Sequence, residues 1–199
     1  MIIIGLTGNI ASGKSAVSRF LKKLGADIVD LDQLAKKIQS QNVNDIIDKM
    51  EEVFGKEVVS NGKVNRKKLG SIVFSDKEKL NKLNEIMIPV MTKFVKKIIE
   101  EKRASGVEVL VVDAAILFEA NWDKIVDTVW VVYIPKKLQL ERLMKRENIG
   151  RGEALRRIES QMPIFEKIKR TDVVIDNSGD FSQMESQILE LWKKIQNSI

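Results

Sequence analysis

One loop near the N-terminus constrains this chain more than any other feature. The eight residues from Gly8 to Ser15 fit the phosphate-binding pattern G-x-x-x-x-G-K-[ST] at every fixed position. The run 1–7 before the loop is apolar and β-branched, and the segment 16–24 after it has apolar residues at helical spacing. A strand, a loop and a helix in this order predict a nucleoside triphosphate site. The alternative is a chance match in a glycine-containing turn.

Each fixed position of the loop has a physical task. Gly8 and Gly13 let the backbone turn tightly, so that N–H groups converge on phosphates at the start of the following helix. Lys14 can reach the β- and γ-phosphates, and the Ser15 hydroxyl is placed to bind Mg²⁺. We therefore expect ATP and Mg²⁺ as cofactors. The residues expected to line the nucleotide are Gly8, Asn9, Ile10, Ala11, Ser12, Gly13, Lys14, Ser15 and Ala16.

Composition excludes several classes of chemistry. With 199 residues and 44% hydrophobic content, the chain can bury a core as one domain. No apolar run approaches the ~20 residues of a membrane span, and no signal-peptide pattern precedes the loop, so we expect a cytoplasmic protein. The chain has no Cys and no His, which excludes disulfides, zinc sites, catalytic thiols and imidazole bases. Acid–base work therefore falls to Asp, Glu or Lys.

The positive charge of the chain is concentrated in one segment. Residues 135–170 hold 11 Lys/Arg against 5 Glu, which accounts for the whole net charge of +6. A local basic patch fits a polyphosphate ligand, and no helix-turn-helix signature, interleaved aromatic residues or zinc module points to nucleic acid. We expect small-molecule substrates as partners, while the oligomeric state is left open.

Two acids end the second predicted strand, residues 26–32. Open parallel sheets place ligands at strand ends, which makes Asp30 and Asp32 candidates for the site. If the strand ends at Asp30, then Asp32 begins the next helix. The alternative is that one of them is only the N-cap of a helix that starts near Gln33. Because no His is available as a base, we expect Asp32 to be catalytic.

Residues 33–105 predict a helical, Lys/Glu-rich insertion with a turn at 58–64. The basic residues Arg66, Lys67 and Lys68 follow this turn and fit either a solvated face or a ligand clamp.

The next strand, 107–113, is a near-continuous apolar run of the kind buried in parallel sheets. Asp113 at its end has the form of a Walker-B acid, which holds Mg²⁺ directly or through water. The alternative for Asp113 is an ordinary strand-to-loop corner. Phe118 and Glu119 follow on the same rim.

A basic lid is predicted after the strand 126–134. The amphipathic helix 136–146, the turn 148–152 and a second helix 153–162 place arginines near a glycine-bearing tip, an arrangement suited to closing over phosphates. Taken singly, each of these arginines fits a surface position. The candidates for stabilising charge on the transferring phosphoryl group are Arg142, Arg146 and Arg151.

A fifth strand, 171–177, and a closing helix, 181–195, complete the pattern. Five strands interspersed with helices predict an α/β, three-layer P-loop NTPase fold with a five-stranded parallel sheet. We expect a single domain, 1–199, whose parts are the core (1–32, 106–135 and 171–199), a helical acceptor-binding insertion (33–105) and a lid (136–170).

Signalling GTPases are disfavoured by the sequence. Their N-K-x-D guanine motif is missing, because the Asn81-Lys82 pair is not followed by the required Asp. A D-x-x-G match at Asp176 follows the last predicted strand and is therefore misplaced. The small size, the acid at the second strand and the basic lid favour a kinase of small molecules.

An ordered set of blocks resembles the dephospho-CoA kinase family from residue 2 to about 195. These blocks are 5–15, 29–32, 72–74 with Leu83 and Pro89, 117–119, 139–143, 157–161 and 172–177. The chain departs from the family pattern at several positions. Asn9 and Ala11 replace glycines, Ile88 stands where His commonly precedes Pro89, Lys36 replaces a frequent Arg, and 114–116 replaces a Pro-Leu-rich segment.

The resemblance implies transfer of the γ-phosphoryl group of ATP to the ribose 3′-hydroxyl of dephospho-CoA, which gives CoA and ADP in the last step of CoA synthesis. Asp32 would accept or orient the hydroxyl proton, Asn177 would lie by adenine, and Lys14, Mg²⁺ and the lid arginines would stabilise charge. Thr7, Asp32, Arg66, Asp113 and Glu119 would contact substrate. Two alternatives remain, another small-metabolite kinase and a non-catalytic ATP-dependent switch.

Overall fold

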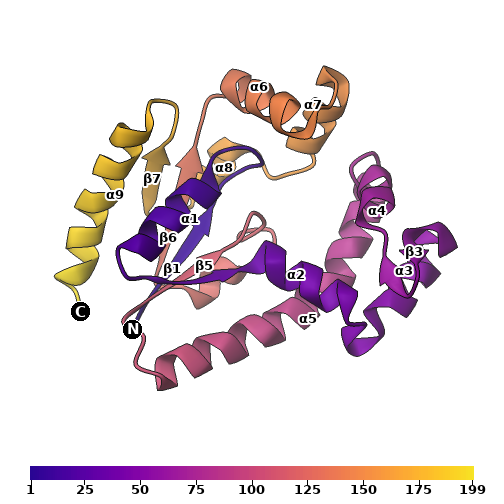
Figure 1. Ribbon diagram of the computed structural model, residues 1–199, viewed down its shortest axis with the longest axis horizontal. Helices are drawn as coiled ribbons and strands as arrows, with labels where there is room; N and C mark the ends of the chain where they lie inside the picture. The colour runs from indigo at the N-terminus through magenta and orange to yellow at the C-terminus, as the bar shows by residue number, and fades with distance from the viewer. The chain divides into compact units, whose positions relative to one another are not determined.

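The computed structural model places β1 (Ile2–Thr7) in the middle of a five-stranded parallel sheet with the order β2-β5-β1-β6-β7 (Figure 1). The structure describes residues 1–199, with the side chain of Asn44 left out. The expected α/β fold with five parallel strands is confirmed. The other strands of the sheet are β2 (Asp27–Asp30), β5 (Val109–Asp113), β6 (Thr128–Tyr133) and β7 (Val173–Asp176).

The register of the sheet brings the carboxyl ends of its central strands together. Leu6 in β1 lies opposite Asp113 in β5, and Asp113 lies opposite Asp30 in β2. β5 is buried along its whole length, as expected for an apolar strand covered on both faces. The phosphate-binding loop therefore leaves the sheet beside Asp113, the acid that ends the adjacent strand, with Asp30 one strand further out.

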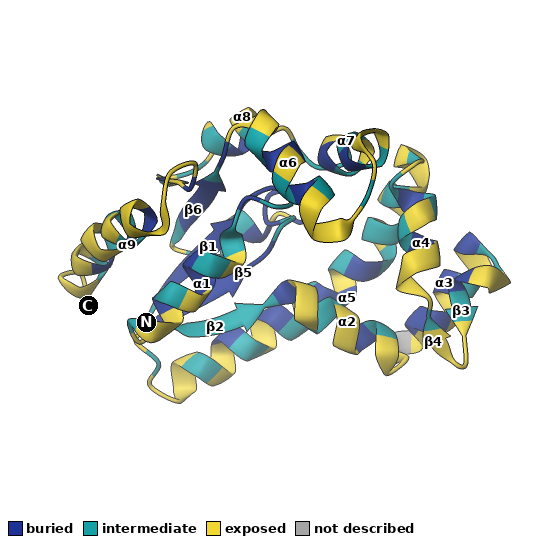
Figure 2. Ribbon diagram, turned by 45° about the horizontal axis from the view of Figure 1, so that its top comes forward, coloured by how far each residue is buried: buried dark blue, intermediate teal, exposed yellow. Residues whose placement is uncertain are grey.

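One face of the sheet is covered by α1 (Lys14–Lys23) and α9 (Phe181–Gln196), which pack against each other (Figure 1). Their apolar positions recur at helical spacing and meet the β-branched side chains of the strands. Figure 2 shows β1, β5 and β6 mostly buried, β2 only partly buried and the outer side of α9 exposed. The buried cluster comprises Ile4, Leu6, Val17, Leu21, Ala26, Val109, Val111, Trp130, Val132, Ile175, Met184, Ile188 and Trp192.

The chain divides into two compact units, residues 1–30 with 99–199 and residues 31–98. The second unit holds the predicted turn, which is a two-residue hairpin turn with φ values of 51° at Asn61 and 68° at Gly62, as a type I′ turn requires. α5 runs from this unit into the first and contains Pro89. The elements of the second unit are α2 (Leu31–Ser40), short 3-10 helices Val43–Asp45 and Lys56–Val58, α3 (Ile46–Phe54), β3 (Val59–Ser60), β4 (Lys63–Val64), α4 (Arg66–Val73) and most of α5 (Lys77–Ala104).

The first unit also contains the two helices expected for the lid, α6 (Lys136–Glu147) and α7 (Arg151–Glu159), which pack against each other (Figures 1 and 2). A further short helix, α8 (Ile164–Ile168), lies within the expected lid range but contacts β6. A 3-10 helix, Trp122–Ile125, precedes β6. None of the helices described is both long enough and apolar enough to cross a membrane.

Candidate active site

The phosphate-binding loop needs both of its fixed glycines for steric reasons. Gly13 is the N-cap of α1 with φ 92°, and a Cβ there would collide with Nδ2 of Asn177. A Cβ on Gly8 would lie 2.8 Å from the carbonyl oxygen of Val132 and 2.7 Å from Oγ of Ser12. Side chains at these positions would therefore push the loop away from β6 and from the segment after β7.

Two of the predicted site residues lie at the loop, one bonded to it directly and the other through the first. Asn177 donates from Nδ2 to the carbonyl oxygen of Ser12 at 2.8 Å. Arg142, from α6, donates to the carbonyl oxygen of Asn177 at 3.2 Å, and its guanidinium lies near Gly13. The structure thus brings an arginine of α6 and the polar corner after β7 to the start of α1, where the helix dipole favours anions.

Lys14 pairs with Asp113 across the end of the sheet. The side chains of Lys14 and Asp113 are only 12% and 4% exposed. Burial raises the pKa of Asp113 from its ordinary value, while Lys14 and a hydrogen bond from Ser18 oppose this rise and nearby Asp30 adds to it. Lys14 of the loop and Asp113 at the end of β5 therefore form one electrostatic unit.

The residues predicted to hold Mg²⁺ supply oxygen ligands. Ser15, the second residue of α1, offers an exposed hydroxyl, and Asp113 offers a carboxylate. Among the described side chains, no three His, Cys, Asp or Glu residues gather as a metal site. Mg²⁺ in nucleotide enzymes is commonly held by one or two protein oxygens together with the substrate phosphates, so this small donor set fits the ion.

Asp32 lies in the first turn of α2, which begins at Leu31. This helix begins two residues earlier than expected, so Asp32 is inside the first turn and the N-cap alternative does not hold for it. Its side chain is exposed. Arg66, the first residue of α4 in the second unit, is exposed as well.

Glu119 is held by a lysine that the sequence analysis did not single out. Lys167, in α8, is fully buried and lies 3.1 Å from Oε1 of Glu119. The same oxygen accepts the N–H of Met162 at 3.1 Å. Burial lowers the pKa of Lys167, and Glu119 opposes the shift. Because lysines are rarely buried, no pattern in this polar segment distinguished Lys167 from its neighbours.

The carbonyl oxygen of Ala115 joins this pair to the end of β1. Lys167 donates to it at 2.7 Å, and the hydroxyl of Thr7 donates to it at 3.3 Å. Thr7 is the residue that immediately precedes the phosphate-binding loop. The predicted residues Thr7 and Glu119 therefore belong to one polar network around the segment after β5.

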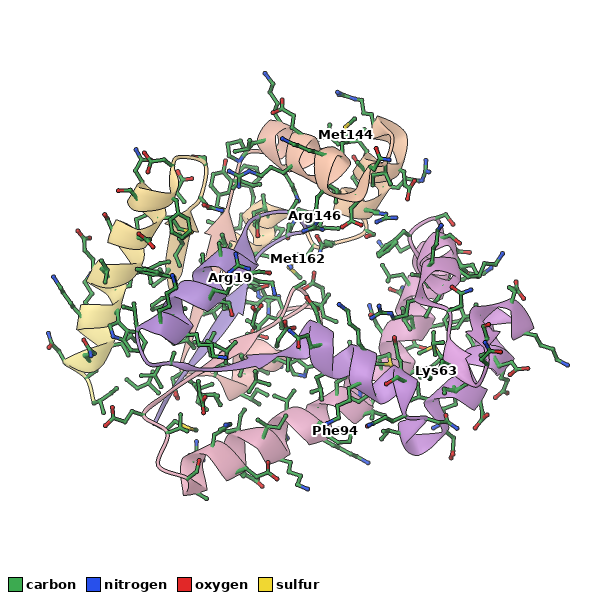
Figure 3. All side chains as sticks on the ribbon, in the orientation of Figure 1. Arg19, Lys63, Phe94, Met144, Arg146 and Met162 are labelled. Atoms are coloured by element: carbon green, nitrogen blue, oxygen red, sulfur yellow. The ribbon has the colours of Figure 1, made fainter. Side chains whose placement is uncertain are left out.

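The other two lid arginines are not brought to the loop in the same way as Arg142. Arg146 donates to the neighbouring Glu147 at 2.9 Å, and its side chain is 54% exposed. Arg151 starts α7 and is exposed. Figure 3 marks Met144 and Arg146 on α6 and Met162 on the segment that follows α7.

Comparison with known proteins gives a consistent family. A family model described as dephospho-CoA kinase matches residues 2–183. A dephospho-CoA kinase of Carboxydothermus hydrogenoformans is 47% identical over 193 residues, which cover 96% of this chain and 93% of that protein. One from Bacillus licheniformis is 41% identical, with 98% of each chain covered. A solved dephospho-CoA kinase from Campylobacter jejuni is 26% identical with a TM-score of 0.70, and 98% of each chain is covered.

Proposed function

The chain belongs to the dephospho-CoA kinase family, and we propose how its own residues carry out the reaction of that family, the ATP-dependent phosphorylation of the ribose 3′-hydroxyl of dephospho-CoA. The observation that carries the proposal is the phosphate-binding loop joined through Lys14 to the buried Asp113 at the end of β5. Asn177 and Arg142 add polar and cationic groups at the same place.

The reaction forms one bond and breaks one. The acceptor oxygen bonds to the γ-phosphorus of ATP, the bond from that phosphorus to the β–γ bridging oxygen breaks, and ADP leaves with the bonding electrons. The hydroxyl proton passes to the carboxylate of Asp32, the acid at the junction of β2 and α2. A sugar hydroxyl is a weak nucleophile, so positioning and charge stabilisation supply most of the rate.

Lys14 would change partner when ATP binds. Its ammonium group pairs with Asp113 in the structure and would move to the β- and γ-phosphates. Arg142 would approach the same phosphates from the lid. Arg146 and Arg151 stay proposals for a closed lid, in which their exposed side chains would be free to turn inward.

Ser15 and Asp113 would hold Mg²⁺ when ATP is bound. The ion would neutralise charge on the phosphate oxygens. Asp113 is released from Lys14 by the change of partner described above, and this leaves its carboxylate available for the role.

The second unit would bind the acceptor, with Arg66 pairing with an acceptor phosphate. Thr7 and Glu119, in the first unit, stay proposals for contact with substrate. Oε2 of Glu119 is a buried oxygen for which the described atoms provide no hydrogen-bond partner, so it has capacity to accept from a ligand. We also propose a cytoplasmic location, because the reaction requires ATP.

Release of ADP by the purified protein tests the function. We expect turnover with Mg²⁺-ATP and dephospho-CoA, and none with AMP, CMP, shikimate or no acceptor. The product should carry its new phosphate on the ribose 3′-oxygen. Turnover of a different acceptor would support another small-metabolite kinase, and ATP binding without any turnover would support an ATP-dependent switch.

A further inference from the structure

Two glutamines at the base of the lid bind the same residue of the phosphate-binding loop. Gln139, buried in α6, donates from Nε2 to the carbonyl oxygen of Ile10 at 2.8 Å. Gln161, which follows α7, accepts the N–H of Ile10 through Oε1 at 2.7 Å. Both polar groups of the Ile10 main chain are therefore held by side chains, one from within α6 and one from the segment that follows α7.

Ile10 lies in a turn with an unusual backbone. The N–H of Ser12 donates to the carbonyl oxygen of Asn9 at 3.0 Å, so Ile10 and Ala11 are the central residues of the turn. Ala11 has φ 62°, whereas φ of Ile10 is not positive, which is the pattern of a type II turn. A left-handed conformation is unfavourable for alanine and easy for glycine, which the family pattern has at this position.

The group that distinguishes a type II turn from a type I turn is its central peptide, here the Ile10 carbonyl and the Ala11 N–H. Gln139 binds that carbonyl. Because the peptide between Ile10 and Ala11 is trans, the Ala11 N–H points in the opposite direction, away from Gln139. N–H groups of such loops are the groups that bind phosphates. Gln139 therefore sets the side of the loop on which this donor is offered.

Further contacts hold the same turn against the lid. The side chains of Ile10 and Ala11 pack on the apolar cluster of the lid, and Asn9 donates from Nδ2 to the carbonyl oxygen of Met162 at 3.2 Å. The methyl group of Ala11, which glycine would lack, is part of this packing. The cluster consists of Leu140, Leu143, Ala154 and Ile158.

We propose that Gln139 and Gln161 are positioning residues for ATP, which hold the phosphate-binding loop in its binding conformation through the main chain of Ile10. The inference rests on the proposed role of this loop. The role that it assigns to Gln139 and Gln161 does not depend on closure of the lid over ATP, since their contacts with Ile10 exist in the ligand-free chain.

The first test uses Gln139→Met, which keeps the length of the side chain and removes its donor, alone and combined with Ala11→Gly. Equilibrium titration with ATP should give a dissociation constant raised by about 10-fold for the single variant, the order of one lost hydrogen bond. KM for ATP should rise with it, while KM for dephospho-CoA stays unchanged. With Ala11→Gly as the background, the effect of Gln139→Met should fall to about 3-fold, since glycine adopts the positive φ without support.

Equal losses in both backgrounds would overturn the inference, because Gln139 would then act only through packing of the lid. The second test covers a failure of Gln139→Met to fold. Gln161→Met should weaken ATP binding by roughly 5-fold or more, whereas Gln161→Glu, which retains an acceptor oxygen, should bind ATP more tightly than Gln161→Met. Gln196→Met, at the exposed end of α9, is the matched control and should bind ATP as the unchanged protein does.

The outcomes separate the inference from the function. If the unchanged protein binds ATP and the glutamine variants bind it equally well, the inference is wrong and the proposed function stands. If the unchanged protein does not bind ATP, the proposed function is wrong and the inference falls with it.

Discussion

Two lysine–carboxylate pairs at the site differ in which partner is the more buried. In the pair of Lys14 and Asp113 the side chains are 12% and 4% exposed, so the acid is the deeper member. In the pair of Lys167 and Glu119 the values are 0% and 19%, so the lysine is the deeper member. Burial raises the pKa of Asp113 and lowers the pKa of Lys167.

This difference distinguishes an ion pair whose lysine can change partner from an ion pair whose lysine stays in place. Lys14 keeps some access to solvent and can leave Asp113 for a phosphate, and Asp113 then has a hydrogen bond from Ser18. Lys167 has no such access and is also bound by the carbonyl oxygen of Ala115. In the proposed reaction the pair with the more accessible lysine, Lys14, would serve the chemistry, while the pair with the buried lysine, Lys167, would hold the backbone.

The largest expected effect is that of Lys14→Ala on turnover. Loss of the ammonium group that meets the phosphates should lower kcat/KM by about 1,000-fold and weaken ATP binding. Lys169→Ala is the control, because Lys169 forms an exposed pair with Glu166. Steady-state ADP release and ATP titration measure both effects. Turnover within a few-fold of the unchanged protein would show that Lys14 is not the exchangeable lysine.

Lys167→Met should affect stability instead. Removing one partner of a buried pair typically costs about 3–5 kcal/mol, and we expect a loss of this order in the free energy of unfolding. Combining it with Glu119→Gln should recover part of the loss, because the double variant has no charged carboxylate left without its lysine. Urea unfolding measures the difference. A stable Lys167→Met protein without turnover would assign Lys167 to the chemistry and reverse the comparison.

Asp32 lies outside both ion pairs. A variant at this position tests whether general-base catalysis is separate from the two pairs. Asp32→Asn should lower kcat by about 100-fold, as expected for a lost general base, with ATP binding close to that of the unchanged protein. Single-turnover kinetics and ATP titration distinguish the two steps. Weakened ATP binding with preserved turnover would contradict the assignment of Asp32.

The smallest effect concerns pH. Since the pKa of Lys167 is lowered in the folded chain from its ordinary 10.5, the folded state binds fewer protons than the unfolded state between those two pKa values. The contribution of Lys167 to the free energy of unfolding should therefore rise with pH in this window, by at most about 1.4 kcal/mol per pH unit. Urea unfolding of the unchanged protein and of Lys167→Met from pH 7 to 10 measures this contribution as the free energy of unfolding of the first minus that of the second. A difference that falls with pH would contradict the lowered pKa.

Much of the fold and part of the site could be predicted from local patterns. The pattern from Gly8 to Ser15 and the apolar run that ends at Asp113 each consist of residues that are consecutive in the sequence. The first directly follows β1, and the second forms β5. Periodicity also predicted α6 and α9 closely. These features need no knowledge of distant contacts, which is why they can be read from a single chain.

The remainder depends on contacts between distant residues. Lys167 resembles the nearby Lys169 in sequence, yet the first is buried and the second is exposed. The short helix α8 was not predicted, because five residues give too little periodicity. Gln139 and Gln161 bind a loop that lies far from them in the sequence, and a glutamine carries no sign of its partner in the sequence.

The hydrogen bonds to Ala115 also bear on which mutations the chain can accept. Both Thr7 and Lys167 donate hydrogen bonds to the backbone oxygen of residue 115, and neither bond involves the methyl group of Ala115. Other amino acids with the same backbone conformation would present the same oxygen. Substitutions at residue 115 that keep this backbone conformation would therefore retain both hydrogen bonds, and an inspection of side-chain identities alone would not register that role.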